Sequence, residues 1–590
     1  MHVAKYPQLA DEIYDVYGRF VIPKKVFPSM RSLQFGGIAI EKNATRMFNC
    51  SFRAVDSIES FNEGMFLLLG GTGLGISVQQ QHVAKLPTIK GPKRLRKKLH
   101  IIEDSIMGWA DAVKVLMKSY FHNKMEVKFD FSEIRHKGAP LKTAGGKAPG
   151  PEPLKLALAH LTAILENALA DRGEGTKLKP VEAFDMYCHI ADAVLAGGIR
   201  RSAMITLFSA EDHEMLYSKS GDWWEKNPQR GRSNNSVALD RKEVTQDDFQ
   251  HIWAITQGSG AGEPGFTWSD NLDWGVNPCC EISLKSNSFC NLTTMIVSDV
   301  ESQDDLNSRA YAASFLGTLQ AGYTDFHYLN DNWQTTTEGD SLLGVSMTGI
   351  ASGEVLKYDI KEAAKVAVDT NKYVAELIGI NPAKRVTAIK PEGTSSLVAG
   401  CSSGIHAYFS PYYVRRMRFN KEEPLFKYLE EKLDGTGLLE DDVFAPDTTS
   451  VLSVPIKSPD EAIFRDESAI DLLKRVKLFQ DDWISAGHIE GDNKNNVSVT
   501  VSIKDGEWDE VESWMWENRK SYTGISVLPF DGGTYPQLPF TESTEEEYTA
   551  LCGIWDKIEF DILDVVEEDD NVQFGAIVAC SGGQCEVTKI

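Results

Sequence analysis

Helical patterns and short apolar runs alternate along the chain, and this alternation constrains the fold more than any other feature of the sequence. Residues 154–172 have apolar side chains at helical spacing and predict an amphipathic helix. Residues 181–209 predict another helix, a break at Gly197 and Gly198, and then a strand. Helices that alternate with strands are typical of sheets whose strands run mostly parallel. The sequence therefore predicts an α/β fold.

The charge and the cysteine content limit the possible partners and surroundings. The formal net charge of -24 disfavours broad binding to nucleic acid or to an anionic membrane, because its field repels phosphate. The most apolar run, residues 66–78, is glycine-rich and too short to cross a bilayer. The start of the chain has no secretory signal, and nine cysteines in 590 residues are too few for a disulfide scaffold. We therefore expect a cytoplasmic protein with neither a nucleic-acid nor a membrane partner.

Two adjacent cysteines stand in the segment 277–281, which reads Asn-Pro-Cys-Cys-Glu. In an extended segment alternate side chains share a face, so Asn277, Cys279 and Glu281 are expected to project together and Cys280 to point away. They would supply a hydrogen-bond donor, a sulfur centre and a possible general base. A turn with buried cysteines is the structural alternative. A zinc site fits less well, because no second C-x2–4-C pair and no histidine lies nearby.

The segment 391–396 is suited to hold phosphate. Backbone N–H groups and hydroxyls at a helix start bind anions, and we expect a helix to begin within this segment. An N-capped structural helix is the alternative. The candidate phosphate ligands are Pro391, Gly393, Thr394, Ser395 and Ser396.

The last segment, residues 559–590, differs in composition from the rest of the chain. It begins with the acidic stretch EFDILDVVEEDDN, and Cys580 and Cys585 follow near its end. Acidic stretches and chain termini tend to be mobile, so this cysteine pair could visit a distant site. Two incidental cysteines at a frayed terminus are the alternative. We expect a flexible tail over 559–590 and a catalytic part over 1–558.

These segments together resemble the ribonucleotide reductase family. Asn-Pro-Cys-x-Glu-Ile at 277–282, followed by Cys-Asn-Leu at 290–292, resembles the active-site finger loop of that family, and FNCSF around Cys50 resembles its first redox cysteine. CSGGQC at 580–585 resembles its cysteine pair at the C-terminus. Further counterparts, in the same order as in the family, are residues 196–203, 232–240, 262–266, 343–350, 390–406 and 413–419.

Within the family, the chain is most similar to the adenosylcobalamin-dependent (class II) enzymes, in particular the monomeric type that reduces ribonucleoside triphosphates. Residues 132–154 and the KPEGTSS segment carry this similarity. Residues 527–539 lack the tyrosine pair that class I large subunits usually have there, and no glycyl-radical motif of class III is found. The chain is shorter than the monomeric enzymes and lacks much of the insertion that builds their effector site. Both a monomer and a homodimer, with or without a deoxynucleotide effector, stay open.

The resemblance implies a ten-stranded α/β barrel made of two parallel five-stranded halves, with a central finger loop that carries the radical cysteine. The barrel and N-terminal effector and specificity elements would occupy residues 1–558. The specificity loop would contain Gly197, Gly198, Arg200 and Arg201, although surface ion pairs are an alternative role for the two arginines. Asp56 is the candidate contact to an effector ribose.

The resemblance also implies a radical mechanism. Adenosylcobalamin, whose cobalt is the only metal expected, would yield a 5′-deoxyadenosyl radical that oxidises Cys279 to a thiyl, and the thiyl would abstract the 3′-hydrogen of a ribonucleotide. Glu281 would act as base on the 3′-hydroxyl, and Asn277 would bind the substrate hydroxyls. Cys50 and Cys290 would supply the reducing equivalents and end as a disulfide.

The same resemblance gives the C-terminal cysteines a role. Cys580 and Cys585 would reduce that disulfide, and thioredoxin or a similar donor would then recharge them.

Two other functions are compatible with the same fold. One is a class I-type large subunit that needs a radical-generating partner protein. The other is a catalytically inert nucleotide-binding regulator, whose expected signature is the loss of Cys279 or Glu281. Both residues are present.

Overall fold

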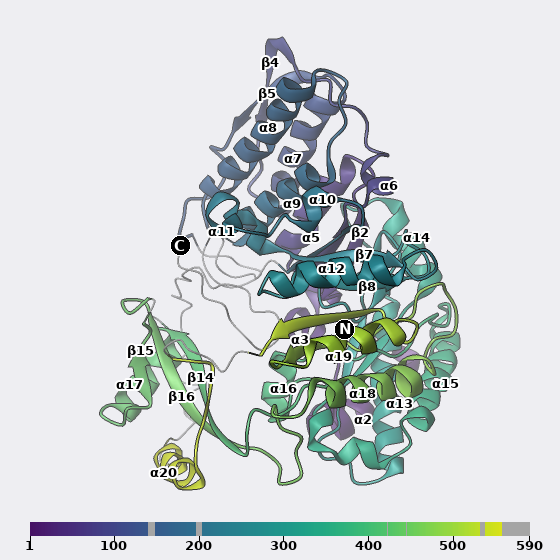
Figure 1. Cartoon of the computed structure of the whole chain (residues 1–590), viewed down its shortest axis with the longest axis vertical. Helices are drawn as coiled ribbons and strands as arrows, with labels where there is room; N and C mark the ends of the chain where they lie inside the picture. Colours follow the sequence, from purple (N-terminus) through teal and green to yellow (C-terminus); the bar gives the residue numbers. More distant parts are fainter. Residues whose placement is uncertain are drawn as a thin grey trace.

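A barrel of two parallel halves forms the centre of the computed structural model, which describes residues 1–139, 148–195, 203–421, 423–443, 445–530, 537–556 and 558 (Figure 1). Five strands of the first half pair in parallel. They are β2 (Cys50–Ala54), β3 (Gly73–Ser77), β6 (Met204–Ser209), β7 (Asn234–Asp240) and β8 (Gly265–Ser269). The connections between them include α5 (Glu59–Gly70), α9 (Pro180–Leu195) and α12 (Gln246–Gly258).

The second half repeats this pattern. Parallel pairing joins β12 (Leu292–Ile296) to β13 (Gly344–Thr348), and β17 (Thr500–Ile503) to β18 (Gly524–Pro529). Between these two pairs, residues 387–389 make parallel bridges to Val345 and Val497 and take the place of a fifth strand. Because β8 and β18 pair antiparallel, the two halves run in opposite directions. The prediction of an α/β barrel with two five-stranded halves is confirmed.

The local predictions for the first half are also confirmed where the structure describes them. Residues 154–172 lie in α8 (Glu152–Arg172), and residues 181–209 contain α9 and β6 as expected. The predicted break between α9 and β6 falls in 196–202, outside the described residues. At the upper end of Figure 1, α7 (Ile106–Phe121) and α8 lie beside a small parallel pair, β4 (Lys93–Ile101) and β5 (Met125–Asp130).

A hairpin inside the barrel carries Cys279 at its tip. Its arms are β9 (Gly275–Val276) and β10 (Ser283–Leu284), which pair antiparallel. Apolar side chains of this loop form an inner core with strands of both halves. The arm lies very close to the barrel wall, since a Cβ on Gly275 would lie 2.0 Å from the Phe52 ring and a Cβ on Gly75 2.0 Å from the Val276 carbonyl oxygen. Glycine at these two positions is therefore required for the loop to fit.

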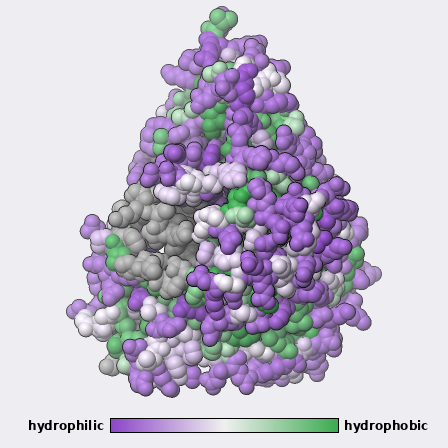
Figure 2. Space-filling view, in the orientation of Figure 1, coloured by the Kyte–Doolittle hydropathy of each residue, from purple (hydrophilic) through white to green (hydrophobic). Residues whose placement is uncertain are grey.

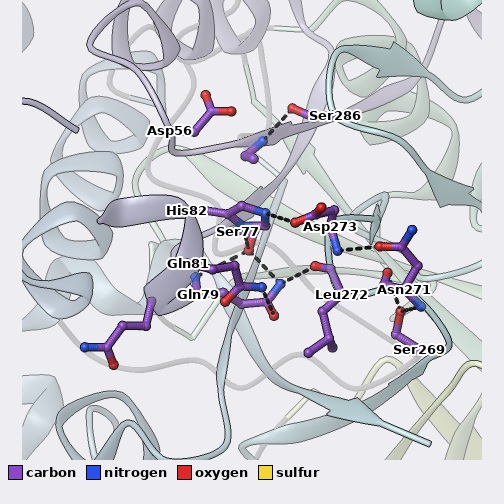
Figure 3. Close-up of polar contacts among 12 residues, drawn as sticks. Asp56, Ser77, Gln79, Gln81, His82, Ser269, Asn271, Leu272, Asp273 and Ser286 are labelled. Atoms are coloured by element: carbon purple, nitrogen blue, oxygen red, sulfur yellow. Dashed lines mark hydrogen bonds and ion pairs between the residues drawn. The ribbon is translucent and has the colours of Figure 1, made fainter. Parts of the chain in front are cut away.

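The connection from β3 to α6 (Gln80–Val83) holds the base of this loop (Figure 3). Gln79 Nε2 donates a hydrogen bond to the Leu272 carbonyl oxygen over 2.9 Å. His82 Nε2 lies 3.3 Å from Asp273 Oδ1, and His82 Nδ1 lies 2.8 Å from Ser77 Oγ. The residues just before β9 are thus tied to the carboxyl end of β3.

A second, antiparallel sheet lies beside the barrel, at the lower left of Figure 1. Its strands are β14 (Tyr412–Asn420), β15 (Leu439–Asp441), β16 (Thr449–Lys457) and β19 (Phe540–Glu542). With α17 (Pro424–Leu433) and α20 (Glu545–Trp555) it forms a small hydrophobic core of its own. The predicted catalytic part, residues 1–558, thus contains a separately cored sheet in addition to the barrel.

The surface agrees with the charged composition of the chain. Hydrophilic residues cover most of the face seen in Figure 2. In the part of the chain that the structure describes, no helix combines the length and the apolar character needed to cross a membrane.

Candidate active site

The tip of the finger loop is a tight turn and not an extended segment. The Cys280 N–H donates to the Asn277 carbonyl oxygen over 2.8 Å, and Cys280 has a φ of 62°, in the left-handed region. Pro278 occupies the second position of this turn, where its restricted φ is favoured. The prediction of an extended conformation is therefore wrong, because the proline and the hydrogen bond across the turn fold the chain back.

The two adjacent thiols nevertheless face different surroundings. The Cys279 thiol lies beside the thiol of Cys50. The Cys280 thiol lies beside the hydroxyl of Thr267. It also lies against β18, where a Cβ on Gly524 would be 2.5 Å from Cys280 Sγ. The expected separation of the two side chains is found, but it results from the turn and not from the alternation of an extended strand.

Three thiols meet at this tip. The Cys290 N–H donates to the Cys50 carbonyl oxygen over 2.9 Å, next to the antiparallel pairing of β2 with β11 (Ser288–Phe289). The Cys50 thiol lies beside the thiols of both Cys279 and Cys290. Cys50 and Cys290 are buried. Cys279 is exposed to solvent, although protein atoms surround its thiol group. The neighbouring Cys50 thiol, enclosure by protein and the nearby Glu281 raise the pKa of Cys279 well above its ordinary value.

Glu281 is a buried carboxyl group next to these thiols. Its side chain is 1% exposed. Burial raises the pKa of Glu281 to about 7, although the neighbouring Asn277 side chain and Lys390 act in the opposite direction. Asn277 Oδ1 accepts a hydrogen bond from the Ile282 N–H over 3.0 Å. Within the described residues, Asn277 Nδ2 and Glu281 Oε2 are buried without a well-formed hydrogen bond, so both can bind a ligand.

Lys390 and Glu392 form a buried ion pair beside Glu281. Lys390 Nζ lies 3.1 Å from Glu392 Oε2. Glu392 Oε1 accepts a hydrogen bond from Thr294 Oγ1 over 2.5 Å. Lys390 acts electrostatically on both Glu281 and Cys279. The sequence did not indicate Lys390 as a site residue; a lysine at the end of an otherwise apolar run, VTAIK, was the available signal.

The predicted phosphate segment begins a short helix as expected. Helix α16 runs over Thr394–Ala399, with Gly393 as its N-cap and Pro391 partly buried before it. Gly393 and Thr394 are exposed. The hydroxyl of Ser395 donates to the Glu392 carboxylate and that of Ser396 to the Glu392 carbonyl oxygen, so both hydroxyls are already used inside the protein. Backbone N–H groups and the Thr394 hydroxyl are the groups of this segment best placed to meet a phosphate.

Asp56 does not lie with these residues at the tip of the loop. It follows the carboxyl end of β2, near the base of the finger loop and its Ser286 (Figure 3). Asp56 Oδ1 lies 3.3 Å from Arg53 Nη1. The specificity-loop candidates and the two tail cysteines lie outside the described residues; they are Gly197, Gly198, Arg200, Arg201, Cys580 and Cys585.

The close approach of Gly524 to Cys280 leads to a prediction about stability. Gly524→Ala is expected to destabilise the fold by roughly 1–3 kcal/mol, the usual cost of overpacking, because the new methyl group would collide with Cys280 Sγ. Cys280→Gly should relieve this collision, since it removes the sulfur and glycine adopts a positive φ without strain. Thermal unfolding of the wild type, both single variants and the double variant measures the effect. A double variant whose destabilisation equals the sum of the two single effects would contradict the contact.

Known proteins resemble the chain over most of its length. A scan against models of protein families finds no match. The chain is 28% identical to an adenosylcobalamin-dependent ribonucleoside-triphosphate reductase of Euglena gracilis, over 92% of this chain and 75% of that protein. It is 27% identical to the reductase of the same name from Lactobacillus leichmannii, over 82% and 70%. For the reductase of Lactobacillus helveticus the identity is 24%, over 98% and 90%.

The fold has a solved counterpart. A crystal structure of a B-12-dependent (class II) ribonucleotide reductase superposes with a TM-score of 0.80 and 22% sequence identity, covering 94% of this chain and 90% of that chain. This likeness establishes the fold, and the matches in sequence extend over the same part of the chain. Over most of its length the chain is thus similar in sequence to adenosylcobalamin-dependent ribonucleoside-triphosphate reductases, and it has the fold of a class II ribonucleotide reductase.

Proposed function

We propose that the chain is a ribonucleotide reductase that converts ribonucleotides, in particular triphosphates, to 2′-deoxyribonucleotides by thiyl-radical chemistry with adenosylcobalamin. The observation that carries the proposal is the meeting of three thiols, Cys279, Cys50 and Cys290, beside the buried Glu281 carboxyl. A structural cysteine cluster does not need an exposed thiol next to a carboxyl group of raised pKa, whereas radical reduction of a ribose needs both.

The described residues fit a radical source that reaches Cys279. Hydrogen transfer from a thiol requires contact with the sulfur, and Cys279 is exposed whereas Cys50 and Cys290 are buried. When bound, adenosylcobalamin would supply the one-electron oxidation of the Cys279 thiol, which ordinary side chains cannot provide. The raised pKa of Cys279 supports the same role, because it keeps the hydrogen on the sulfur at neutral pH.

Each group at the tip can then carry out a separate step of the reaction. The Cys279 sulfur takes the 3′-hydrogen atom of the ribose, and Glu281 takes the proton of the 3′-hydroxyl. Asn277 Nδ2, which has no well-formed hydrogen bond within the described residues, donates to a substrate hydroxyl.

The other two thiols complete the reduction. Cys50 and Cys290 deliver two protons and two electrons; the 2′-hydroxyl leaves as water, and the two sulfurs end as a disulfide. Cys279 finally returns its hydrogen atom to C3′, and Glu281 returns the proton to the 3′-oxygen, so both groups are ready for another turnover.

The remaining assignments are extensions of this proposal. The start of α16, with Pro391 before it, would hold the substrate phosphates. The loop with Arg200 and Arg201 would couple the substrate to a deoxynucleotide effector, and Asp56 would contact that effector. Residues 559–590 would be a redox tail, recharged by thioredoxin or a similar donor. The thiols must be kept reduced, which suits the cytoplasm, and the chain would act as a monomer or a homodimer.

An anaerobic assay of the purified chain tests the proposal. ATP or CTP, a dithiol and adenosylcobalamin are supplied, and no second protein is added. Deoxynucleotide formation that requires adenosylcobalamin is the expected result. Activity only with a separate metal-containing subunit would indicate a class I-type large subunit, and nucleotide binding without any product would indicate an inert regulator.

The rate should depend on pH through Glu281. A general base is active as the carboxylate, and the pKa of Glu281 is about 7, so activity is present above pH 7 and is lost as the pH falls through this value. Below the midpoint, kcat/KM should fall about tenfold per pH unit. The profile is measured between pH 5.5 and about 8.5, with stability checked at each pH. A rate that stays constant down to about pH 5.5, as it would with an ordinary glutamate pKa, would exclude Glu281 as this base.

A further inference from the structure

The tip of the finger loop is held in place by contacts with a segment that the sequence did not indicate as part of the site. The base of the loop is tied to β3 and α6 (Figure 3), but Cys279 lies at the far end of both arms. The run Asn493-Lys494-Asn495-Asn496 lies along the loop, just before the strand that contains Val497 and β17. Three amides in four residues were the available signal.

Asn496 is the member of this run that contacts the tip. It is 0% exposed. Its backbone N–H donates to the Glu281 carbonyl oxygen over 2.8 Å. Its Nδ2 donates to the Cys280 carbonyl oxygen over 3.1 Å and to the Gly524 carbonyl oxygen over 2.7 Å.

The other atoms of Asn496 are also in use, which fixes its orientation. Asn496 Oδ1 accepts hydrogen bonds from the Thr523 N–H over 3.1 Å and from Gln480 Nε2 over 2.5 Å. Its carbonyl oxygen accepts from the Ile389 N–H over 3.2 Å. A rotation of the amide would break the two hydrogen bonds that Nδ2 donates and the two that Oδ1 accepts. It would leave buried polar groups unpaired, which is costly.

From these contacts we infer that Asn496 is a positioning residue that holds Cys279 against Cys50 and aims Glu281 at the same site. It binds the two peptide carbonyls that follow Cys279 and ties them to β18 and to the segment around Ile389. The turn is thus connected to both neighbouring parts of the second half of the barrel. The inference rests on the proposed reductase function and adds to it a residue that touches neither substrate nor cofactor.

Asn495 provides a matched control on the same segment. It is 2% exposed, and its Nδ2 donates to the carbonyl oxygens of Leu343 and Thr387 over 3.4 and 3.0 Å. Its Oδ1 accepts from the Ser283 N–H over 3.3 Å. Asn495 therefore has a similar burial and a similar set of bonds, directed to the barrel and one arm of the loop and not to residues 277–281.

The test compares Asn496→Ala with Asn495→Ala, and Asn496→Ser with Asn495→Ser if an alanine variant does not fold. Thermal unfolding establishes a temperature at which all proteins are folded. The alkylation rate of Cys279 by iodoacetamide is then measured by peptide mass spectrometry, without nucleotide or cofactor. Loss of the contact with Cys50 should lower the pKa of Cys279 and expose more thiolate. We expect alkylation about tenfold faster in the Asn496 variant, equivalent to one pKa unit, and unchanged in the Asn495 variant.

Steady-state kinetics supply the second measurement. The Asn496 variant should lose kcat by about tenfold or more with a nearly unchanged KM, because α16 is not disturbed. The Asn495 variant should keep both constants near the wild-type values at the same temperature. Equal thiol reactivity in the two variants, or a fall in kcat without a change at Cys279, would overturn the inference. Because the alkylation needs no substrate, its outcome holds even if the chain proves not to be a reductase.

Discussion

Cys279→Ser should abolish deoxynucleotide formation, a loss on the order of 10⁴-fold or more, comparable to the removal of a covalent participant from other enzymes. A serine hydroxyl does not form the radical under the same conditions. Cys280→Ser should keep most of the activity, because the Cys280 side chain faces Thr267 and Gly524 and not Cys50. The two variants differ from the wild type by one atom each at adjacent positions, so a general effect on folding cannot explain a large difference between them.

The measurement is product formation per enzyme with saturating adenosylcobalamin, together with the unfolding temperature of each variant. The reverse pattern, with Cys280 essential and Cys279 dispensable, would mean that Cys280 and not Cys279 is the radical cysteine. Equal losses in both variants would indicate damage to the turn and not the loss of a radical site.

Cys50→Ser or Cys290→Ser should stop normal reduction with every reductant, because each removes one of the two thiols that form the product disulfide. The double variant of Cys580 and Cys585 should behave differently. It should still make about one product per enzyme in a single turnover, because Cys50 and Cys290 start reduced. Its cycling with thioredoxin should fail, and a small dithiol that diffuses to the buried disulfide should partly restore it.

The comparison is the turnover rate with thioredoxin against the rate with dithiothreitol, for each variant. Normal thioredoxin-driven turnover in the double tail variant would exclude the transfer of electrons through Cys580 and Cys585. It would favour the alternative, two incidental cysteines at a frayed terminus. Single-turnover product from Cys290→Ser in normal yield would instead remove Cys290 from the reducing pair.

The sequence by itself determined the local elements and indicated the groups that we propose to be reactive. Apolar periodicity is a local property, so the helix over 154–172 and the helix and strand of 181–209 were predicted correctly. The order of the motifs also indicated the barrel before any distance was known. Alternation along a strand, however, was the wrong model for residues 277–281, because Pro278 and one hydrogen bond across the turn decided the conformation.

Only the tertiary structure decided which of these groups act on one another. Cys50, Cys279 and Cys290 meet because β2, β11 and the finger loop converge in the barrel, and contacts between distant segments leave no periodic signal in the sequence. The raised pKa of Glu281 has the same origin, since burial is a property of everything packed around a residue. Three amides in four residues mark the segment of Asn496 but do not show which amide is the anchor. Its role lies in hydrogen bonds to the carbonyls of Cys280 and Gly524, and every residue has a backbone carbonyl.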